Sequence, residues 1–412
     1  MKKTKNKNTY SSSFSLKLYA LCQRLPFLRY LKVILYFTDF FLLIFIKKPK
    51  YKSGEKKKVF VMFNYAFGDG VIWLNSAKEL RNIYPKDKYE ITLICQKGIH
   101  TLYENEKIFD EVLPYNLTKS TFNIKTRFNL FKLLRKEYYD IVLDPIGVYE
   151  CTTNVFMSRA LCAKKKVTLL DVTLKSRMCP LWMSNRIYDE IVKITKPHLS
   201  LIDYYYELIR YLGNSKIETK YYPLSDVKLS IKLPKKFVIF FPSASTQLKR
   251  WPIERYAEIA HRFYSKTKLP IVLCGTKDDL NSLNEFKDKI KDIPSVDIIG
   301  KTTLLEFIQV VKKASYVITN DTSTYHIAVI NQIPVAIITG GYTYDRYVTY
   351  KFKNSNKYKK PYVIVNKMDC FNCDNKCKKL KSKDATWPCL NAVTTEYAWK
   401  IIDKMIEENK EK

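Results

Sequence analysis

Polar side chains suited to binding an anion lie between two apolar runs near residue 320. The polar turn follows the apolar run 316–319 and precedes a second apolar run, 327–330. This pattern predicts a buried strand, a turn and the start of a helix. A helix N-terminus offers unpaired N–H groups and a partial positive charge, which suits a diphosphate. The candidate ligands in this turn are Asp321, Thr322, Ser323, Thr324 and His326.

A second segment has the same layout. The apolar run 237–241 ends at Pro242-Ser243-Ala244-Ser245 and is followed by Lys249-Arg250-Trp251-Pro252 and a helical pattern. Small residues let a ligand approach the backbone, and Lys249 is long enough to reach a diphosphate. Ser243, Ser245 and Lys249 are therefore further candidates. For both segments a simpler interpretation stays open, in which Asp321 or Thr322 caps a helix and Lys249 is a solvated surface lysine.

Three blocks in order resemble the heptosyltransferase family of lipopolysaccharide synthesis, glycosyltransferase family nine. The run 59–71, with Gly68-Asp69-Gly70-Val71 at its end, is similar to the family's opening strand and Leu-Gly-Asp turn. The segment 242–252 is similar to its Pro-Gly-Ala and Lys-x-Trp-Pro element. Gly300 to Leu304 with Asn320 to Ala328 is similar to its Gly-x-x-x-Leu and Asn-Asp-Ser/Thr-Gly-x-x-His signature. The resemblance covers roughly residues 58 to 402.

The resemblance implies an inverting glycosyltransferase of GT-B architecture, an α/β fold with two Rossmann-like, doubly wound domains facing a cleft. It implies ADP-heptose as the nucleotide-sugar donor and the inner core of lipopolysaccharide, or a related glycolipid, as the lipid-linked acceptor. Asp69 matches the family's catalytic aspartate and is the expected general base. The chain departs from the family at four positions: Phe63 replaces a basic residue, Asn75 a proline, and Ser243 and Ser323 glycines.

Other carboxylates have less specific patterns. Asp278 and Asp279 follow the apolar run 271–274, and either is placed to accept hydrogen bonds from a ribose, although a solvated helix start fits equally well. Asp144 is a candidate acceptor contact. Asp69 has a second interpretation too, as the cap of a helix beginning at Gly70. No Asp-x-Asp pair lies in a metal-holding loop, so catalysis is expected to need no cofactor.

The chain carries a formal net charge of +32 over 412 residues. Such an excess suits nucleic acid, an anionic membrane surface or an acidic substrate. Nucleic acid is disfavoured, because the basic residues are dispersed and no RNA- or DNA-binding motif is present. Together with the lipid-linked lipopolysaccharide acceptor that the resemblance implies, the charge favours an anionic membrane surface, and a peripheral protein at the cytoplasmic face of a bacterial inner membrane is expected.

The apolar and aromatic stretch 27–46 supports a membrane contact. Arg29, Lys32 and Asp39 interrupt it, and the clean run is shorter than the ~20 residues of a bilayer-spanning helix. Lysines precede it at 2–7 and follow it at 47–58. An interfacial helix is therefore expected. The alternative is a helix packed on the domain.

Apolar periodicity predicts alternating strands and helices beyond Gly54. Strands are expected at 59–63, 90–95, 140–145, 237–241, 270–274, 316–319 and 334–338, and helices at 70–83, 201–212 and 395–408. The segment 221–236 is the expected linker. The predicted organisation is a membrane-associating extension (1–54), an acceptor domain (55–225), a nucleotide-sugar domain (235–394) and a helix that crosses back to the first domain (395–412).

Four of the ten cysteines form a cluster at Cys370, Cys373, Cys377 and Cys389. Four thiolates at this spacing can bind one structural zinc. Two disulfides or four free thiols remain alternatives. For the whole chain, the alternative to a transferase is a GT-B-like protein that binds glycolipid without catalysis.

Overall fold

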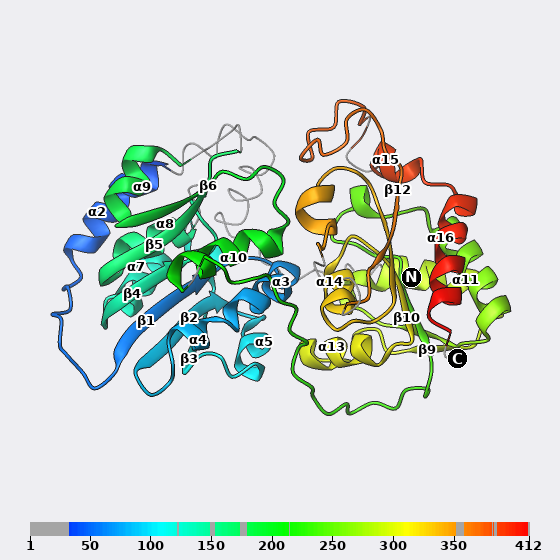
Figure 1. Ribbon diagram of the computed structural model, residues 1–412, viewed down its shortest axis with the longest axis horizontal. Helices are drawn as coiled ribbons and strands as arrows, with labels where there is room; N and C mark the ends of the chain where they lie inside the picture. The colour runs from blue at the N-terminus through cyan, green and yellow to red at the C-terminus, as the bar shows by residue number, and fades with distance from the viewer. Residues whose placement is uncertain are drawn as a thin grey trace, which may run out of the picture. The chain divides into compact units, whose positions relative to one another are not determined.

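The computed structural model describes residues 33–121, 123–148, 153–173, 179–213, 215–351, 358–380, 382 and 385–410. The chain divides into two compact units. Unit 1 contains the described residues up to Tyr65, with Leu80–Lys196 and Glu207–Ser215. Unit 2 contains Ala66–Glu79, Pro197–Tyr206 and the described residues from Lys216 onward. Each unit is built on one six-stranded sheet (Figure 1).

The sheet of unit 1 is parallel throughout, with strand order β3-β2-β1-β4-β5-β6. The strands are β1 (Lys57–Phe63), β2 (Tyr89–Gln96), β3 (Glu111–Tyr115), β4 (Tyr138–Asp144), β5 (Cys162–Asp171) and β6 (Glu190–Ile194). The helices are α2 (Ile34–Ile44), α4 (Leu80–Ile83), α5 (His100–Asn105), α6 (Leu117–Ser120), α7 (Ile124–Leu134), α8 (Thr153–Ala160) and α9 (Leu181–Ile187). Residues 59–63 of β1 are all buried, as expected for a strand covered on both faces.

The sheet of unit 2 is also parallel, with strand order β12-β11-β10-β7-β8-β9. The strands are β7 (Val238–Phe241), β8 (Ile271–Leu273), β9 (Ser295–Asp297), β10 (Tyr316–Asn320), β11 (Val335–Thr339) and β12 (Tyr362–Val365). The helices are α3 (Phe67–Ala77), α11 (Ile253–Thr267), α12 (Leu280–Lys289), α13 (Leu304–Lys313), α14 (Ser323–Ile330), α15 (Pro388–Asn391) and α16 (Thr395–Glu408). Short turns η2 (Gln247–Lys249) and η3 (Lys277–Asp279) and the π-helical turn η4 (Tyr344–Val348) complete the unit, and α10 (Leu201–Leu212) contains a boundary between the units.

The strand order of each sheet confirms the doubly wound α/β fold class. In unit 2 the chain runs outward from β7 to β9, returns to β10 beside β7, and then runs outward again to β12. Ligands of such sheets bind beyond the carboxyl ends of the strands at the point where the order reverses. In unit 2 this switch point lies between β7 and β10.

All seven strands predicted from the sequence are present, and α10 covers the predicted residues 201–212. The predicted helix 70–83 is instead two helices, α3 and α4. Five strands were not predicted: β3, β5, β6, β9 and β12. β5 begins Cys162-Ala163-Lys164-Lys165-Lys166, so its first half lacks an apolar pattern. The expected linker 221–236 contains no helix or strand.

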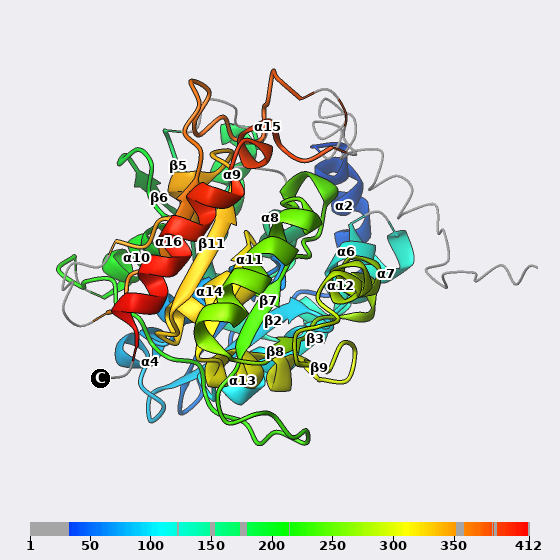
Figure 2. The same ribbon diagram turned by 90° about the vertical axis from the view of Figure 1, so that its right-hand side faces the viewer.

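The C-terminal helix α16 packs on the sheet of unit 2, and its predicted crossing back to the first domain stays a prediction. Its apolar side is buried in the main core of unit 2, through Ala398, Ile402, Met405 and Ile406. Figure 2 shows α16 beside α11 in front of β11 and β7. The helix is amphipathic, as the sequence predicted. Its apolar side covers the sheet of unit 2.

The helix α2 is packed on unit 1, the interpretation that the sequence made less favoured. Asp39 and Leu43 are buried, and Leu43 joins a core cluster with Phe60 and Phe131. Residues 2–7 and 27–32 lie outside the described residues. No helix in the described ranges has both the length and the apolar character needed to cross a membrane.

Candidate functional site

A pocket of about 830 Å³ lies in unit 2 at the switch point of its sheet. Its walls come from the loops that follow β7, β8, β9 and β10, from the first turn of α3 and from η4. Of the residues predicted from the sequence, those that line it are Asp69, Ser245, Lys249, Asp278, Asp279, Asp321, Thr322, Ser323 and His326. Residues far apart in sequence, such as Asp69 and His326, thus share one pocket.

Two helix N-termini meet at this pocket. α3 begins at Phe67 and α14 begins at Ser323, and neither has a side-chain cap. The two first turns touch, because a Cβ placed on Gly68 would lie 3.5 Å from the Cα of Ser323. Both helices therefore present unpaired N–H groups and partial positive charge to the same space. Such an arrangement binds phosphate oxygens.

Asp69 lies in the first turn of α3 and lines the pocket. The residue before α3 is Ala66, so Asp69 is not the helix cap that the sequence left open. Burial raises the pKa of its carboxyl to about 6, while the nearby charges of Arg346 and Lys249 lower it. A carboxylate with this pKa is mostly ionised at pH 7 and a stronger base than an ordinary aspartate.

Lys249 and Asp321 form an ion pair at the pocket wall. Lys249 Nζ lies 2.8 Å from Asp321 Oδ2, and the Tyr342 hydroxyl donates to the same oxygen at 3.1 Å. The Lys249 charge and hydrogen bond hold the pKa of Asp321 below its usual range, although burial opposes this shift. An ionised Asp321 repels a diphosphate, so the arrangement makes it the residue that positions Lys249. Lys249 keeps donor capacity for an anion, since an ammonium has three N–H groups.

His326 lines the pocket from α14. Its Nδ1 is 2.8 Å from the Tyr350 hydroxyl. Burial lowers the pKa of His326 to about 4, so the imidazole is neutral at physiological pH. It can hydrogen-bond to a ligand but does not add charge.

The two aspartates after β8 have different surroundings. Asp279 Oδ1 accepts from Ser243 Oγ at 2.6 Å, and Oδ2 accepts from the backbone N–H and hydroxyl of Thr276. Both oxygens are thus occupied in holding the loop. Asp278 is exposed at the pocket wall. Of the pair, Asp278 is the one available to a ribose.

Ser243 and Thr324 are buried and do not line the pocket. Ser243 replaces a glycine of the resembling family, and its hydroxyl braces Asp279 rather than facing a ligand. Asn75, which replaces a proline, accepts from the backbone N–H of Tyr222 at 2.7 Å. Phe63 is a buried core residue. These three departures therefore have structural partners of their own.

The sequence did not identify several pocket residues. Phe241 and Phe307 line it with ring centroids 6.3 Å apart, and Leu304 adds a further apolar wall. Arg250, Lys277 and Tyr347 line its polar side. Most of these residues follow the carboxyl end of a strand. A sequence analysis that predicted β9 and the loop after β11 would have identified Leu304, Phe307 and Tyr347.

Asp144 is far more enclosed than an acceptor contact requires. It is fully buried at the end of β4, and its Oδ2 accepts from the Tyr188 hydroxyl at 2.5 Å and from Asn154 Nδ2 at 2.6 Å. Burial raises the pKa of its carboxyl to about 6 against these hydrogen bonds. This placement favours a structural role for Asp144.

The four clustered cysteines line a second, small pocket of unit 2 with Met368, Phe371 and Trp387. All four are free thiols, so neither disulfide is present. Within the described ranges, no three His, Cys, Asp or Glu side chains are arranged to hold a metal ion. The predicted structural zinc stays a prediction that this arrangement does not support.

The signature of glycosyltransferase family 9 (heptosyltransferase) matches residues 127–338, just over half of the chain. The chain belongs to this family. Its members are glycosyltransferases, and the matched segment carries Lys249 and the β10–α14 turn.

Relatives and solved structures agree with this assignment. The chain is 24% identical over 282 residues to the lipopolysaccharide core heptosyltransferase OpsX of Haemophilus influenzae, covering 66% of this chain and 75% of OpsX. A family 9 glycosyltransferase from Veillonella parvula has a TM-score of 0.65 at 17% identity, covering 85% of this chain and 97% of its own. E. coli heptosyltransferase WaaC, solved with ADP-2-deoxy-2-fluoro heptose, has a TM-score of 0.60 at 14% identity, covering 85% and 99%. These structures share the fold of this chain.

Proposed function

We propose that the protein transfers a heptose from ADP-heptose, with inversion, to the inner core of lipopolysaccharide or a related glycolipid. The family assignment supports a glycosyltransferase. The names of OpsX and of the ligand-bound WaaC supply the sugar, the nucleotide and the class of acceptor.

The proposal rests mainly on one observation: a candidate base and a candidate anion-binding site line the same pocket. Asp69 has a pKa of about 6, and the same pocket has Lys249 and two helix N-termini. Glycosyl transfer needs a group that accepts the proton of the acceptor hydroxyl and positive charge that stabilises the departing diphosphate. The pocket contains both.

The proposed reaction is one displacement at the anomeric carbon. Asp69 takes the proton of the acceptor hydroxyl as the acceptor oxygen bonds to that carbon. The bond from the carbon to the diphosphate oxygen breaks on the opposite side, which inverts the configuration. The ADP leaves with an additional negative charge, which Lys249 and the N–H groups of α3 and α14 stabilise.

The remaining walls suit the rest of the donor. Phe241, Phe307 and Leu304 offer apolar surface for a nucleobase, and Asp278 accepts hydrogen bonds from the ribose. Arg250 and Lys277 add two cationic groups to the pocket. We propose that protein cations neutralise the diphosphate and that transfer requires no metal cofactor.

We place the enzyme at the cytoplasmic face of the inner membrane as a peripheral protein. The net charge of +32 supports attraction to anionic lipid, and the acceptor of such a reaction is lipid-linked. Unit 1 is proposed to bind the acceptor and unit 2 the donor, with Asp69 contributed by the segment that follows β1.

A second function is a catalytically inactive glycolipid-binding protein, because Ser323 replaces a glycine where backbone must approach phosphate. The two functions are distinguished by incubating the purified protein with ADP-heptose and a heptose-deficient core acceptor. Transfer of one heptose, or slow release of ADP without acceptor, supports the enzyme. Glycolipid binding with no turnover of any nucleotide sugar supports the second function.

A further inference from the structure

An aromatic surface covers the outer side of α2 in unit 1. Phe45 is 79% exposed and Phe41 63% exposed, although both are large apolar side chains. We call this surface the apolar face; it consists of Ile34, Phe37, Phe40, Phe41, Ile44 and Phe45 on and just after α2 with Leu181 and Trp182 on α9. Contiguous exposed aromatic side chains mark an interaction surface.

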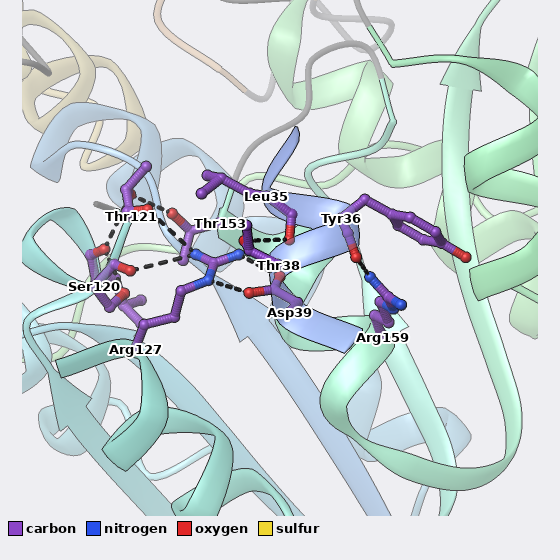
Figure 3. A network of polar contacts seen from close by, with 10 residues as sticks. Leu35, Tyr36, Thr38, Asp39, Ser120, Thr121, Arg127, Thr153 and Arg159 are labelled. Atoms are coloured by element: carbon purple, nitrogen blue, oxygen red, sulfur yellow. Dashed lines mark hydrogen bonds and ion pairs between the residues drawn. The ribbon is translucent and has the colours of Figure 1, made fainter. Parts of the chain in front are cut away.

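Polar contacts from Asp39 and Tyr36 attach α2 to unit 1 (Figure 3). Asp39 Oδ1 and Oδ2 accept from Arg127 Nε and Nη2, each at 2.5 Å. Arg159 donates to the carbonyl of Tyr36. On α9, the ring of Trp182 lies edge-on to that of Tyr36 at 5.3 Å. These contacts bury the Asp39 side of α2 against unit 1, so the exposed aromatics lie on its outer side.

A basic groove of about 540 Å³ adjoins this face. Phe40 and Ile44 of the apolar face line it, together with the cationic residues Lys48, Arg135, Arg159 and Lys166. No carboxylate lines it in the part of unit 1 that the structure describes. The groove thus joins an apolar edge to four positive charges.

Three of these cations, Arg135, Arg159 and Lys166, donate hydrogen bonds to backbone carbonyls. Arg135 Nη1 donates to Leu43 and Ile46 at 2.6 Å each, and Lys166 Nζ donates to Ser158 at 2.6 Å and Leu161 at 2.7 Å. Burial lowers the pKa of Lys166 to about 8 and lowers the pKa of Arg135 and Arg159. Desolvated cations whose hydrogen bonds go to carbonyls rather than to carboxylates are stabilised by an anion.

We propose that the apolar face inserts into a bilayer and that the adjoining groove binds the phosphate of an anionic phospholipid. Aromatic side chains beside clustered cations match a molecule whose acyl chains adjoin a phosphate. A protein partner would match the aromatics but would need its own carboxylates at the groove. This inference concerns unit 1 and does not depend on the transfer reaction.

Flotation of the full-length protein with vesicles tests the proposal. Binding is expected to vesicles of phosphatidylcholine with phosphatidylglycerol and to be much weaker with phosphatidylcholine alone. A variant with Phe37→Ser, Phe41→Ser and Phe45→Ser should bind at least about tenfold more weakly. Lys48→Ala should bind about fivefold more weakly to the anionic vesicles only. Tyr397→Ser and Lys400→Ala, exposed positions on α16, are the matched controls and should bind like the wild type.

A second measurement locates the contact. Trp182 is 41% exposed, whereas Trp73, Trp251 and Trp387 are buried and Trp399 of α16 is partly buried against the core of unit 2. Vesicles with brominated acyl chains should quench the tryptophan emission of the wild type, and most of this quenching should be lost in Trp182→Phe. Because all these substitutions are at exposed positions, circular dichroism and Tm should match the wild type.

Three results would overturn the proposal. Equal vesicle binding by the triple phenylalanine variant and the wild type would assign docking to other residues, such as the undescribed N-terminal segment. A concentration-dependent dimer that the triple variant abolishes, without vesicle binding by the wild type, would make the apolar face an interface between copies. Full competition by inorganic phosphate at low concentration would make the groove a site for free phosphate.

Discussion

Asp39 of α2 and Arg127 of α7, 88 residues apart, form a two-point ion pair with both side chains almost fully buried. The Arg127 guanidinium also lies over the ring of Phe156 at 4.6 Å. Burial raises the pKa of Asp39, and the Arg127 hydrogen bond and charge oppose this shift. The pair makes α2 an integral part of unit 1, although the family resemblance begins after it.

Asp39→Ala should destabilise the protein by about 3–5 kcal/mol, because it leaves the buried Arg127 charge without a partner. Urea unfolding measures the change. The double variant Asp39→Leu with Arg127→Met should recover most of the loss, since it removes both charges together. Asp39→Ala with an unchanged unfolding midpoint would contradict this account of α2.

For the same reason, deleting residues 1–54 is expected to destabilise unit 1 rather than merely release it from membranes.

The rate of transfer should fall with decreasing pH below about 6, the pKa of Asp69, because the protonated carboxyl cannot accept a proton. Arg346 lowers this pKa more than Lys249 does. Arg346→Met should therefore move the acidic limb of the kcat/KM profile to higher pH. The matched variant Arg255→Met removes an arginine that is not among the charges shifting the pKa of Asp69 and should leave the limb in place. An acidic limb that is the same in the Arg346 variant and the wild type would exclude Asp69 as the titrating base.

Lys249→Ala should weaken donor binding and lower kcat by about 100-fold, because the charge on the leaving diphosphate grows as the bond breaks. Steady-state kinetics and calorimetric titration with ADP measure the two effects. Lys249→Arg keeps the charge and should retain more activity. Unaltered kinetics for Lys249→Ala would remove this residue from the donor site.

Asp278 and Asp279 should behave differently although they are adjacent. Asp278→Ala should raise the KM for the donor with little change in stability, because the side chain is exposed at the pocket. Asp279→Ala should lower the Tm, because it removes the acceptor for Ser243 and Thr276. Thermal unfolding and donor kinetics, measured for both variants, distinguish the two roles. A raised donor KM for Asp279→Ala, with a lowered Tm for Asp278→Ala, would assign the ribose to Asp279.

Sequence patterns were sufficient where the chemistry is local. The runs before Ser243 and Asp321 are strands as the pattern predicted, and residues of both polar turns line one pocket. The pattern failed where partners come from distant elements. Nothing around Asp321 indicates that Lys249 and Tyr342 occupy its carboxylate, and nothing around Ser243 indicates that its hydroxyl braces Asp279. The family aspartate was identified by resemblance, whereas its raised pKa depends on burial within the fold.

The packing of α2 could not be predicted because its sequence fits two environments. The aromatic content of the stretch 27–46 and the lysines on both sides of it favoured an interfacial helix over a helix packed on the domain. One polar residue, Asp39, decides which side is buried, and its partner Arg127 lies in a helix with no sequence signal of its own for pairing. The same arrangement leaves the phenylalanines exposed.

The central claim is that Asp69 is the base of a glycosyl transfer, and Asp69→Asn tests it most directly. Heptose transfer by this variant and its affinity for ADP are measured side by side, with Asp278→Asn as a control on the same pocket. Transfer should fall by roughly 10²–10⁴-fold while ADP affinity changes little, because a base acts only in the chemical step. Transfer near the wild-type rate, or loss of ADP binding in parallel with loss of transfer, would contradict the claim.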